Sequence, residues 1–455
     1  MARFSGLIEL LRPQVISQWA LGVRRSLAAV EPGLDDLSCQ VALPPMSGSF
    51  NLLYRLDFSD HVSWVLRIPR SNKAGQYGRP QTRFIECEVG VMCLLRRHTS
   101  IPIPQVFSYS ATPNNPLGVP FILMEFVSGV PVYDLWFKED GQTPLETRRL
   151  RILDGVAACM AQLAGFSFAH LATLSPDPSS STETPYPLNT LNEQAQHDAL
   201  KDDIEPEFEY TQIGPFTSSQ DYFKALLSMQ SIPDTSSGRS DLELRIGVQR
   251  LVKVMIECLP LSIESVQESQ SLESLETFVL AHPDFNVQNI LVNEDGTIAA
   301  IIDWDNVHTV PRCIGYSRYP SWLTRDWDPM MYGYGIPDSR PENSPDELEF
   351  YRQYYSAAIG ALRPAGSIDF TTKSHLYEAV WIAASSPLCI FDIVEKIFEY
   401  VFPEAEQEDQ EYPLEYYDVV HAIAKDELAP PAQQRMYEAI RNAFSAPNTR
   451  KRLGD

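Results

Sequence analysis

The 455-residue chain is short of positive charge. Its 36 lysines and arginines stand against 60 aspartates and glutamates, which gives a formal net charge of −24. DNA and RNA bind to positively charged surfaces, so this balance excludes nucleic acid as the partner. An anionic membrane surface is disfavoured for the same reason. Any anionic ligand must therefore be held locally, by a metal ion, by a few arginines or lysines, or by backbone N–H groups.

Glycine is also scarce, with 22 residues against 35 prolines. The sequence contains neither G-x-G-x-x-G nor G-x-x-x-x-G-K, so nucleotide sites of the Rossmann and Walker types are excluded. No apolar run approaches the roughly 20 residues that span a bilayer, and we expect no membrane segment. The balance of 44% hydrophobic and 21% charged residues is typical of a globular chain.

The seven cysteines form no Cys-x-x-Cys pair and are odd in number. This disfavours a disulfide framework or a zinc knuckle and favours reduced thiols in a cytoplasmic protein. Residues 1–27 contain arginines and serines, which leaves a mitochondrial presequence as an alternative. The simpler interpretation of this segment is an amphipathic helix that packs on the body of the protein.

Apolar periodicity predicts a change from strands to helices along the chain. The even-numbered residues of 62–68 are apolar and alternate with Ser63, Val65 and Arg67, as in a strand with two distinct faces. Residues 83–98 have the period of a helix, and an apolar run predicts a buried strand over 120–127. A further helix is expected at 148–163, and the chain beyond residue 340 is expected to be mostly helical.

The most informative segment lies between residues 281 and 305. Within it, Ile290–Val292 and Thr297–Ile302 are short apolar runs that predict two strands. Asn293–Gly296 joins them, with glycine at a position where a hairpin needs positive φ. The segment is therefore predicted to fold into a tight antiparallel hairpin.

This hairpin brings polar residues to its open end. Asn289 precedes the first strand, Asp303 ends the second, and Asp284 lies on the loop that leads in. We expect these oxygens to converge, and hard oxygens of this kind suit Mg²⁺, which takes one or two carboxylates plus substrate phosphates. The remaining acidic group can accept a hydroxyl proton, as in phosphoryl transfer. The pattern His-x-Asp-x-x-x-x-Asn, which starts at His282, is typical of a kinase catalytic loop.

The segment resembles a known family. Because Trp304 follows Asp303 where protein kinases have Phe-Gly, the sequence is similar to the aminoglycoside phosphotransferase family, within the wider choline-kinase-like group. The resemblance extends over about residues 41–330. Further motifs resemble the fungal-type branch of this family, in the order Trp64–Pro69, Ile101–Val106, Phe121–Val127, Gly214–Thr217 and Trp322–Pro329.

The resemblance implies roles for individual residues. Asp284 corresponds to the catalytic base, and Asn289 and Asp303 correspond to the metal ligands. Arg67 falls where the family often has the lysine that contacts the nucleotide phosphates, and Glu88 corresponds to its ion-pair partner. His282 is expected to orient the catalytic loop by hydrogen bonding and not to perform acid–base chemistry.

The resemblance also implies where a nucleotide binds. The hinge whose backbone hydrogen-bonds the adenine corresponds to Glu125, Phe126 and Val127. The loop that covers the phosphates corresponds to residues 47–51, and it begins with Ser47, Gly48 and Ser49. The expected cofactors are Mg²⁺ and ATP, with GTP as an alternative to ATP.

The sequence departs from the family pattern at three positions. Arg67 is a planar, always charged group and is not equivalent to a lysine ammonium. The covering loop has the single glycine Gly48, and Pro283 stands where relatives usually carry glycine. Arg67 and the loop with a single glycine motivate a second hypothesis, a pseudokinase that acts as a nucleotide-binding or protein-interaction module with little turnover.

Several other residues keep two interpretations at this point. Asp305 could assist the metal or bind substrate, or could be an ordinary exposed carboxylate. Asp326 and Asp328 could hold a cationic substrate, or could have helix-capping or surface roles. Arg67 and Glu88 could form a purely structural ion pair. The motif Gly165–Ala169 resembles the nucleophile elbow of esterases, but that elbow needs a strand before its serine and a helix is expected here.

Together these patterns predict an α+β, two-lobed, protein-kinase-like fold. A helical extension (1–40) is expected to precede a β-rich N-lobe (41–127) and a larger, mainly helical C-lobe (128–455) with an insertion at about 165–250. The predicted function is Mg²⁺- and ATP-dependent phosphorylation of a hydroxyl group on a small molecule. The acidic composition would also suit a cationic acceptor, and no oligomeric state is predicted.

Overall fold

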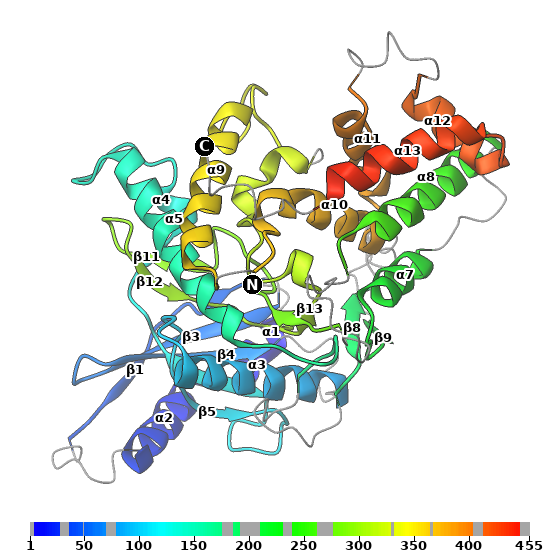
Figure 1. The fold of residues 1–455 in the computed structure, drawn as a ribbon. Helices are drawn as coiled ribbons and strands as arrows, with labels where there is room; N and C mark the ends of the chain where they lie inside the picture. Colours follow the sequence, from blue (N-terminus) through cyan, green and yellow to red (C-terminus); the bar gives the residue numbers. More distant parts are fainter. Residues whose placement is uncertain are drawn as a thin grey trace. The chain divides into compact units, whose positions relative to one another are not determined.

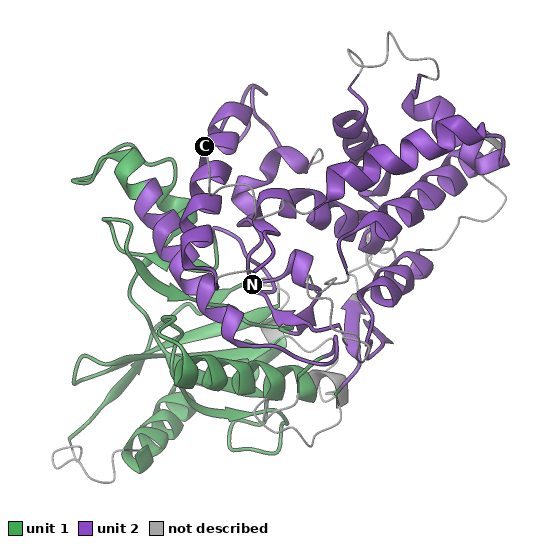
Figure 2. Cartoon of the chain, viewed as in Figure 1, with its two compact units in different colours: residues 1–148, 173–185, 288–307 green, residues 149–172, 186–287, 308–455 purple. Residues whose placement is uncertain are grey.

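The computed structural model describes most of the chain and divides it into two compact units (Figure 2). Unit 1 comprises residues 1–148, 173–185 and 288–307, and unit 2 comprises residues 149–172, 186–287 and 308–455. The described residues are 4–27, 36–48, 50–69, 79–174, 185–191, 210–230, 239–261, 276–328, 332–364, 367–403 and 413–445.

Unit 1 is built on an antiparallel sheet with the strand order β1-β3-β4-β6-β5, in which β2 also pairs with β3 (Figure 1). The long strands β3 and β4 pair from Asn51 with Pro69 to Asp57 with Ser63. The strands are β1 (Cys39–Val41), β2 (Met46–Ser47), β3 (Asn51–Phe58), β4 (Ser63–Pro69), β5 (Val106–Ser110) and β6 (Phe121–Glu125).

Helices cover both faces of this sheet. The N-terminal helices α1 (Ser5–Leu10) and α2 (Pro13–Leu27) pack through residues such as Ile16 against one face, which includes Leu66 of β4. The expected amphipathic N-terminal helix that packs on the body is therefore present. Helix α3 (Arg79–His98) packs on the opposite side of β6, where it shares a core cluster with Ile122.

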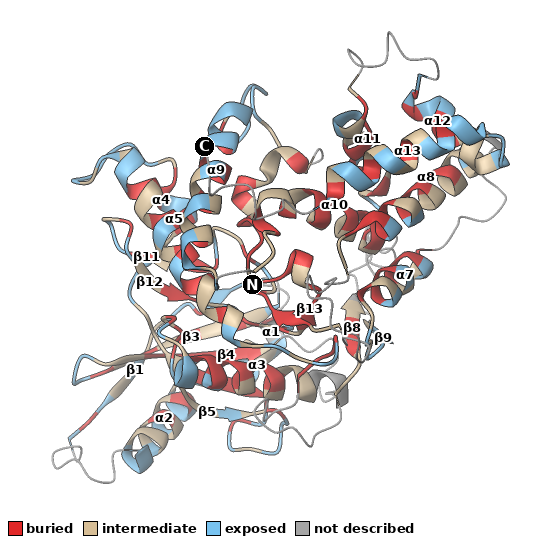
Figure 3. Ribbon diagram, viewed as in Figure 1, coloured by how far each residue is buried: buried red, intermediate tan, exposed pale blue. Residues whose placement is uncertain are grey.

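This arrangement corrects the prediction of two distinct faces for β4. Trp64, Leu66 and Ile68 are buried, as expected, but Val65 and Arg67 on the other side are also only 9% and 7% exposed. Figure 3 accordingly shows β4 mostly in the colour of buried residues. The alternation in the sequence is real, but both faces of a central strand are covered by helices. Arg67 therefore lies under α3 and not at the surface.

A second, three-stranded sheet in unit 1 has the order β12-β11-β7. Strands β11 (Ile290–Val292) and β12 (Ile298–Ile301) form the predicted hairpin, and β7 (Val130–Pro131) pairs with β11. Gly296 in the turn has φ +90°, and a Cβ there would lie 2.7 Å from the carbonyl oxygen of Arg148. The turn thus needs glycine both for its backbone and for its packing.

Unit 2 is mainly helical. Its largest core cluster is formed mainly by α7, α8 and α10–α13. Two short antiparallel strand pairs accompany the helices. They are β8 (Leu188–Leu191) with β9 (Tyr210–Ile213), and β10 (Val279–Leu280) with β13 (Thr309–Val310). The long helices are α5 (Leu145–Ala161, which begins in unit 1), α7 (Ser219–Met229), α8 (Arg239–Cys258), α9 (Pro345–Leu362), α10 (Ser374–Ser385), α11 (Ile390–Val401), α12 (Tyr416–Lys425) and α13 (Pro430–Phe444).

The predicted α+β class is confirmed, and so is the mainly helical character of the chain beyond residue 340. None of the described helices is long and apolar enough to cross a membrane. The two units group residues 288–307 with the N-terminal part of the chain, whereas the sequence placed them in the second lobe. The predicted lobe and insertion boundaries stay predictions.

Helices α8 and α12 approach each other closely at Gly247. A Cβ at this position would lie 2.1 Å from the carbonyl oxygen of Val420 and 2.6 Å from its Cγ1 atom. Both atoms belong to a helix that is packed into the core of unit 2, so they cannot move aside without disturbing other contacts. The absence of a side chain at Gly247 therefore sets the distance between these helices.

We expect Gly247→Ala to lower the free energy of unfolding by about 1–3 kcal/mol, the usual cost of overpacking a core. Urea-induced unfolding followed by circular dichroism measures this change. The matched control is Gly22→Ala, a helical glycine with no neighbouring atom within 4 Å of the added Cβ. This control is expected to be neutral or slightly stabilising. Equal stability of the two variants would contradict the account of the α8–α12 contact.

Candidate active site

The hairpin β11–β12 brings Asn289 and Asp303 to its open end, as predicted. Ile290 pairs with Ile301, and the amide of Ile302 donates a 2.9 Å hydrogen bond to the carbonyl oxygen of Asn289. Asp303 directly follows Ile302, just beyond the end of β12. The side chains of Asn289 and Asp303 are therefore carried by two backbone segments that are hydrogen-bonded to each other.

Asp303 has an unusual backbone. Its φ is +64°, a conformation that side-chain-bearing residues adopt rarely, although Asp does so more readily than most. The following Trp304 is fully buried, and its indole N–H donates to the carbonyl oxygen of Ile301 at 3.2 Å. The chain thus turns sharply at Asp303 and is anchored directly after it. Backbone strain of this kind is concentrated at functional sites.

Arg67 and Glu88 meet beneath α3. The guanidinium of Arg67 donates through Nη2 to Glu88 Oε2, and both side chains are almost fully buried. Nη1 of Arg67 lies 3.4 Å from Oδ1 of Asp303. The structure therefore brings together three of the residues that the sequence assigned to the site, one from β4, one from α3 and one from the exit of β12.

Negative charge exceeds positive charge around Arg67. Burial acts to lower the pKa of Arg67, but Glu88, Asp305 and Asp303 together raise it above its ordinary value. Burial raises the pKa of Glu88 to about 7; Arg67 opposes this effect, and Asp305 and Asp303 add to it. One guanidinium therefore faces three carboxylates. Sequence reasoning left the role of Asp305 open, and the structure places it in this charge cluster.

The donor set fits a divalent cation. No cluster of three or more His, Cys, Asp or Glu side chains able to hold a metal occurs among the described residues, so a closed all-protein metal site is not found there. Asp303, with 44% of its side chain exposed, and the carboxamide of Asn289 are side chains of the kind that Mg²⁺ takes when substrate phosphates supply the other ligands, and their role as metal ligands stays a prediction. The surplus negative charge beside Arg67 favours the same ion.

Asp284 and His282 belong to unit 2, because the division of the chain falls between Val287 and Gln288. Asp284 is exposed and its carbonyl oxygen accepts a 2.9 Å hydrogen bond from the amide of Asn286. His282 is 2% exposed, with its ring 6.3 Å from the ring of Phe285. The predicted convergence of Asp284 with Asn289 and Asp303 stays a prediction.

The predicted hinge follows the last residue of β6. The amide of Phe126 donates to the carbonyl oxygen of Ser63 at 3.1 Å, and the guanidinium carbon of Arg55 lies 4.2 Å from the centre of the Phe126 ring. Glu125 is bonded through its amide to the carbonyl oxygen of Gln105 at 2.8 Å. Within the described residues, no backbone–backbone hydrogen bond of Val127 is found outside the helices and strands, and the role of this segment as a hinge stays a prediction.

The predicted covering loop is a tight hairpin between β2 and β3. Ser47 pairs with Leu52, and the amide of Gly48 donates to the carbonyl oxygen of Asn51 at 3.0 Å. Gly48 does not have a positive φ, and a Cβ there would meet only the Asn51 oxygen, at 4.0 Å. Neither the backbone conformation nor the packing explains why residue 48 is a glycine. Ser49 lies outside the described residues.

The esterase-like nucleophile elbow and the role of Asp326 in binding a cationic substrate both lose support. The serine of the elbow-like motif, Ser167, follows a helical stretch that ends at Gly165, and its Oγ accepts a hydrogen bond from Arg312 at 3.0 Å. Asp326, considered for a cationic substrate, is bound at 2.8 Å by Arg352, and its carbonyl oxygen accepts a bond from Lys396. Asp326 is thus occupied by cations of the chain itself.

The chain matches the sequence model of the phosphotransferase enzyme family over residues 43–333. This range includes most of unit 1 and the segment with Asp284, Asn289 and Asp303. It amounts to more than half of the chain.

Curated relatives come from fungi. A subtelomeric hrmA-associated cluster protein of Aspergillus fumigatus is 24% identical over 385 residues, which cover 69% of this chain and 68% of that protein. Altered inheritance of mitochondria protein 9, mitochondrial, of Candida glabrata is 29% identical over 149 residues, or 30% of this chain and 22% of that protein. Its counterpart in Eremothecium gossypii is 22% identical over 59% of this chain and 49% of its own length.

The solved structures that match this chain include two phosphotransferases. A thermostable aminoglycoside phosphotransferase mutant, in a ternary complex with AMP-PNP and hygromycin B, is 15% identical and covers 89% of this chain and 94% of its own, with a TM-score of 0.41. Macrolide 2'-phosphotransferase type I is 12% identical and covers 90% of this chain and 96% of its own, with a TM-score of 0.38.

The raised pKa of Glu88 makes the stability of the protein depend on pH. The carboxyl pKa is 4.5 in the unfolded chain and about 7 in the folded one, so the folded protein binds the Glu88 proton more tightly than the unfolded chain does. Its contribution to stability is fully present below pH 4.5 and is lost as pH rises through 7. We expect the free energy of unfolding of the wild type, relative to Glu88→Gln, to fall by on the order of 2 kcal/mol between pH 4.5 and 7.5.

Urea titrations of both proteins at several pH values in this range test the prediction. Glu86→Gln, on the same helix, controls for the loss of a carboxylate in general. A difference between wild type and Glu88→Gln that stays constant over this range would show that Glu88 is ionised throughout.

Proposed function

Because the chain belongs to the phosphotransferase enzyme family, we propose that it transfers the γ-phosphate of ATP to a hydroxyl group of a small molecule in a Mg²⁺-dependent reaction. The observation that carries this proposal is the pairing of Asn289 and Asp303 at the open end of one hairpin, with the buried Arg67–Glu88 pair next to Asp303. Oxygen ligands for a divalent cation and a fixed guanidinium are the parts that phosphoryl transfer requires.

The proposed roles follow the chemistry of each group. Asn289 and Asp303 would hold Mg²⁺, which when bound neutralises phosphate charge and orients the phosphates for in-line displacement. Asp284 accepts the proton of the acceptor hydroxyl while the oxygen of that hydroxyl forms a bond to the γ-phosphorus. The bond from the γ-phosphorus to the bridging oxygen breaks, and ADP leaves with that oxygen. His282 supports the loop from its buried position.

The nucleotide is proposed to lie on the residues of unit 1. Arg67 contacts its phosphates and is held in place by Glu88, while the backbone of Glu125–Val127 binds the adenine. Residues 47–51, with Ser47, Gly48 and Ser49, cover the phosphates. Because a hinge reads the base through backbone groups, GTP is an alternative to ATP.

The acceptor is proposed to be a small molecule with a free hydroxyl group. The crystallised aminoglycoside phosphotransferase holds hygromycin B, which makes polyhydroxylated compounds a reasonable first panel, and the acidity of this chain favours cationic members of it. A cytoplasmic location is proposed. The mitochondrial names of several curated relatives make the mitochondrion the alternative.

One observation favours a second candidate, a nucleotide-binding module with little turnover. The cation beside Asp303 is an arginine, and it is engaged by two carboxylates of the chain, Glu88 and Asp303. A guanidinium held in this way is less free than a lysine ammonium to follow a phosphate during transfer. The kinetic experiment below separates the two candidates.

We expect Asp284→Asn to lower kcat for phosphate transfer about 10²–10⁴-fold, because the general base is lost. Asp303→Asn is expected to lower activity to a similar extent, since transfer depends on charge neutralisation as much as on the base. The measurement is γ-³²P transfer from Mg-ATP to a panel of amino sugars, amino alcohols and sugars, after a thermal-shift screen for nucleotide binding.

Glu294→Gln is the matched control, because it removes an exposed carboxylate from the turn of the same hairpin. It should transfer phosphate at the wild-type rate. Binding of Mg-ATP by the wild type without transfer to any acceptor would favour the module with little turnover. The absence of any stabilisation by Mg-nucleotide would refute both candidates.

Gly48 provides a test of the covering loop. An alanine side chain fits at this position without a close contact, so Gly48→Ala should leave the melting temperature unchanged. If the phosphates approach the backbone closely, the added methyl group should weaken ATP binding about tenfold. Isothermal titration with Mg-AMP-PNP measures the affinity, and Gly22→Ala controls for a neutral glycine substitution. Unchanged affinity would show that the loop does not cover the phosphates.

A further inference from the structure

Asp284 is bracketed by two main-chain carbonyl groups that are held by one downstream segment of unit 2. Arg318 binds the carbonyl oxygen of His282, two residues before Asp284. Ser321 binds the carbonyl oxygen of Phe285, directly after it. We propose that Arg318 and Ser321 are positioning residues that fix the backbone of the catalytic loop. This inference rests on the proposed function of Asp284.

Arg318 forms the first contact from a buried position. Its Nη2 atom donates to the His282 carbonyl oxygen at 2.9 Å, and its Nη1 atom lies 3.1 Å from Oε1 of Glu378 on α10. The side chains of Arg318 and Glu378 are only 10% and 12% exposed. Burial raises the pKa of Glu378 and Arg318 opposes this effect. One guanidinium thus ties the loop to a core helix through two different nitrogen atoms.

Ser321 forms the second contact with two donors. Its amide and its hydroxyl group each lie 3.0 Å from the carbonyl oxygen of Phe285. The neighbouring rings of Phe285 and Trp322 are 6.1 Å apart in an edge-to-face arrangement. Two hydrogen bonds on one carbonyl leave the peptide between Phe285 and Asn286, one residue beyond Asp284, little freedom to rotate.

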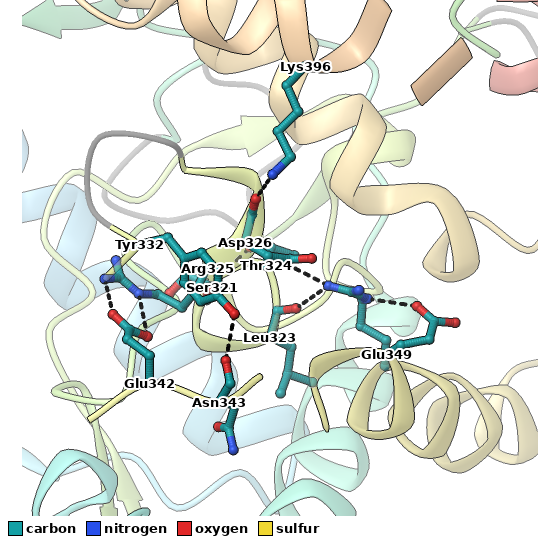
Figure 4. A network of polar contacts seen from close by, with 11 residues as sticks. Ser321, Leu323, Thr324, Arg325, Asp326, Tyr332, Glu342, Asn343, Glu349 and Lys396 are labelled. Carbon is teal, nitrogen blue, oxygen red and sulfur yellow. Dashed lines mark hydrogen bonds and ion pairs between the residues drawn. The ribbon is translucent and has the colours of Figure 1, made fainter. Parts of the chain in front are cut away.

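The segment that carries Ser321 is itself held by a polar network (Figure 4). Arg352 of α9 donates to the carbonyl oxygen of Leu323 at 2.9 Å and to the carboxylate of Asp326 at 2.8 Å. Lys396 of α11 binds the carbonyl oxygen of Asp326. Further contacts join Arg325 to Glu342, Arg352 to Glu349 and Tyr332 to Asn343.

These contacts are expected to affect how precisely Asp284 is positioned and not how tightly ATP binds. Asp284 is exposed, and the backbone on either side of it sets the position from which its side chain extends. A misplacement of about 1 Å at a reacting group can cost about 10²-fold in rate. Loosening either carbonyl contact should therefore lower kcat and leave the affinity for ATP unchanged, because the proposed ATP-binding residues lie in unit 1.

The test compares Ser321→Ala with Ser385→Ala by hydrogen exchange and kinetics. Ser321→Ala keeps the amide contact and removes only the hydroxyl contact, so the fold is expected to persist. Ser385→Ala also removes a hydroxyl-to-carbonyl bond, of 2.9 Å to Trp381, together with a longer one, of 3.4 Å to Ile382, within α10 of the same unit. We expect faster amide exchange over residues 282–289 in Ser321→Ala only. We also expect about tenfold lower kcat for ADP release from Mg-ATP with unchanged KM, and recovery of both in Ser321→Thr.

Arg318→Lys extends the test to the other side of the loop. The ammonium can retain the contact with Glu378 but cannot serve two acceptors with a fixed fork, so exchange over 282–289 should again increase.

Equal exchange and equal kcat in Ser321→Ala and Ser385→Ala would overturn the proposal. If the wild type and Asp284→Asn release ADP at the same rate, the proposed function fails, whereas the exchange measurement still decides whether these residues hold the loop.

Discussion

The burial of the Arg67 guanidinium is the constraint on which the candidate site of unit 1 depends. A charged group inside a protein needs partners, because an unpaired buried charge is strongly destabilising. Glu88 on α3 and Asp303 after β12 supply them. The pairing therefore joins the central strand of one sheet, the helix that covers it and the hairpin of the other sheet, and it leaves more negative than positive charge where a divalent cation would bind.

The catalytic loop depends on a different principle. Asp284 itself is exposed, and the backbone carbonyls of His282 and Phe285 on either side of it are bound by Arg318 and Ser321. Buried ion pairs often add little net stability, but they specify geometry, as the Arg318–Glu378 pair does here. Both halves of the proposed chemistry thus depend on a buried arginine: Arg318 beside the loop with Asp284, and Arg67, which is proposed to contact the nucleotide phosphates.

Local patterns in the sequence predicted the hairpin well. The positive φ of Gly296, the two strands and the placement of Asn289 beside the exit of the second strand all follow from short-range turn and strand chemistry. Alternation in β4 was interpreted wrongly, because a period of two cannot show that helices cover both faces of a sheet. Arg318 and Ser321 had no sequence signal, since their partners are main-chain atoms more than 30 residues away. The roles of the site residues and the lobe boundaries stay predictions.

The central claim is that Asn289 and Asp303 bind a divalent cation together with a nucleotide. Mn²⁺ can replace Mg²⁺ at oxygen ligands, and its binding can be followed by electron paramagnetic resonance in the presence and absence of AMP-PNP. The account predicts that the wild type forms a ternary complex with Mn²⁺ and AMP-PNP and that Asp303→Asn loses it, while Glu294→Gln retains it. Equal Mn²⁺ binding by all three proteins, with no dependence on the nucleotide, would contradict the account.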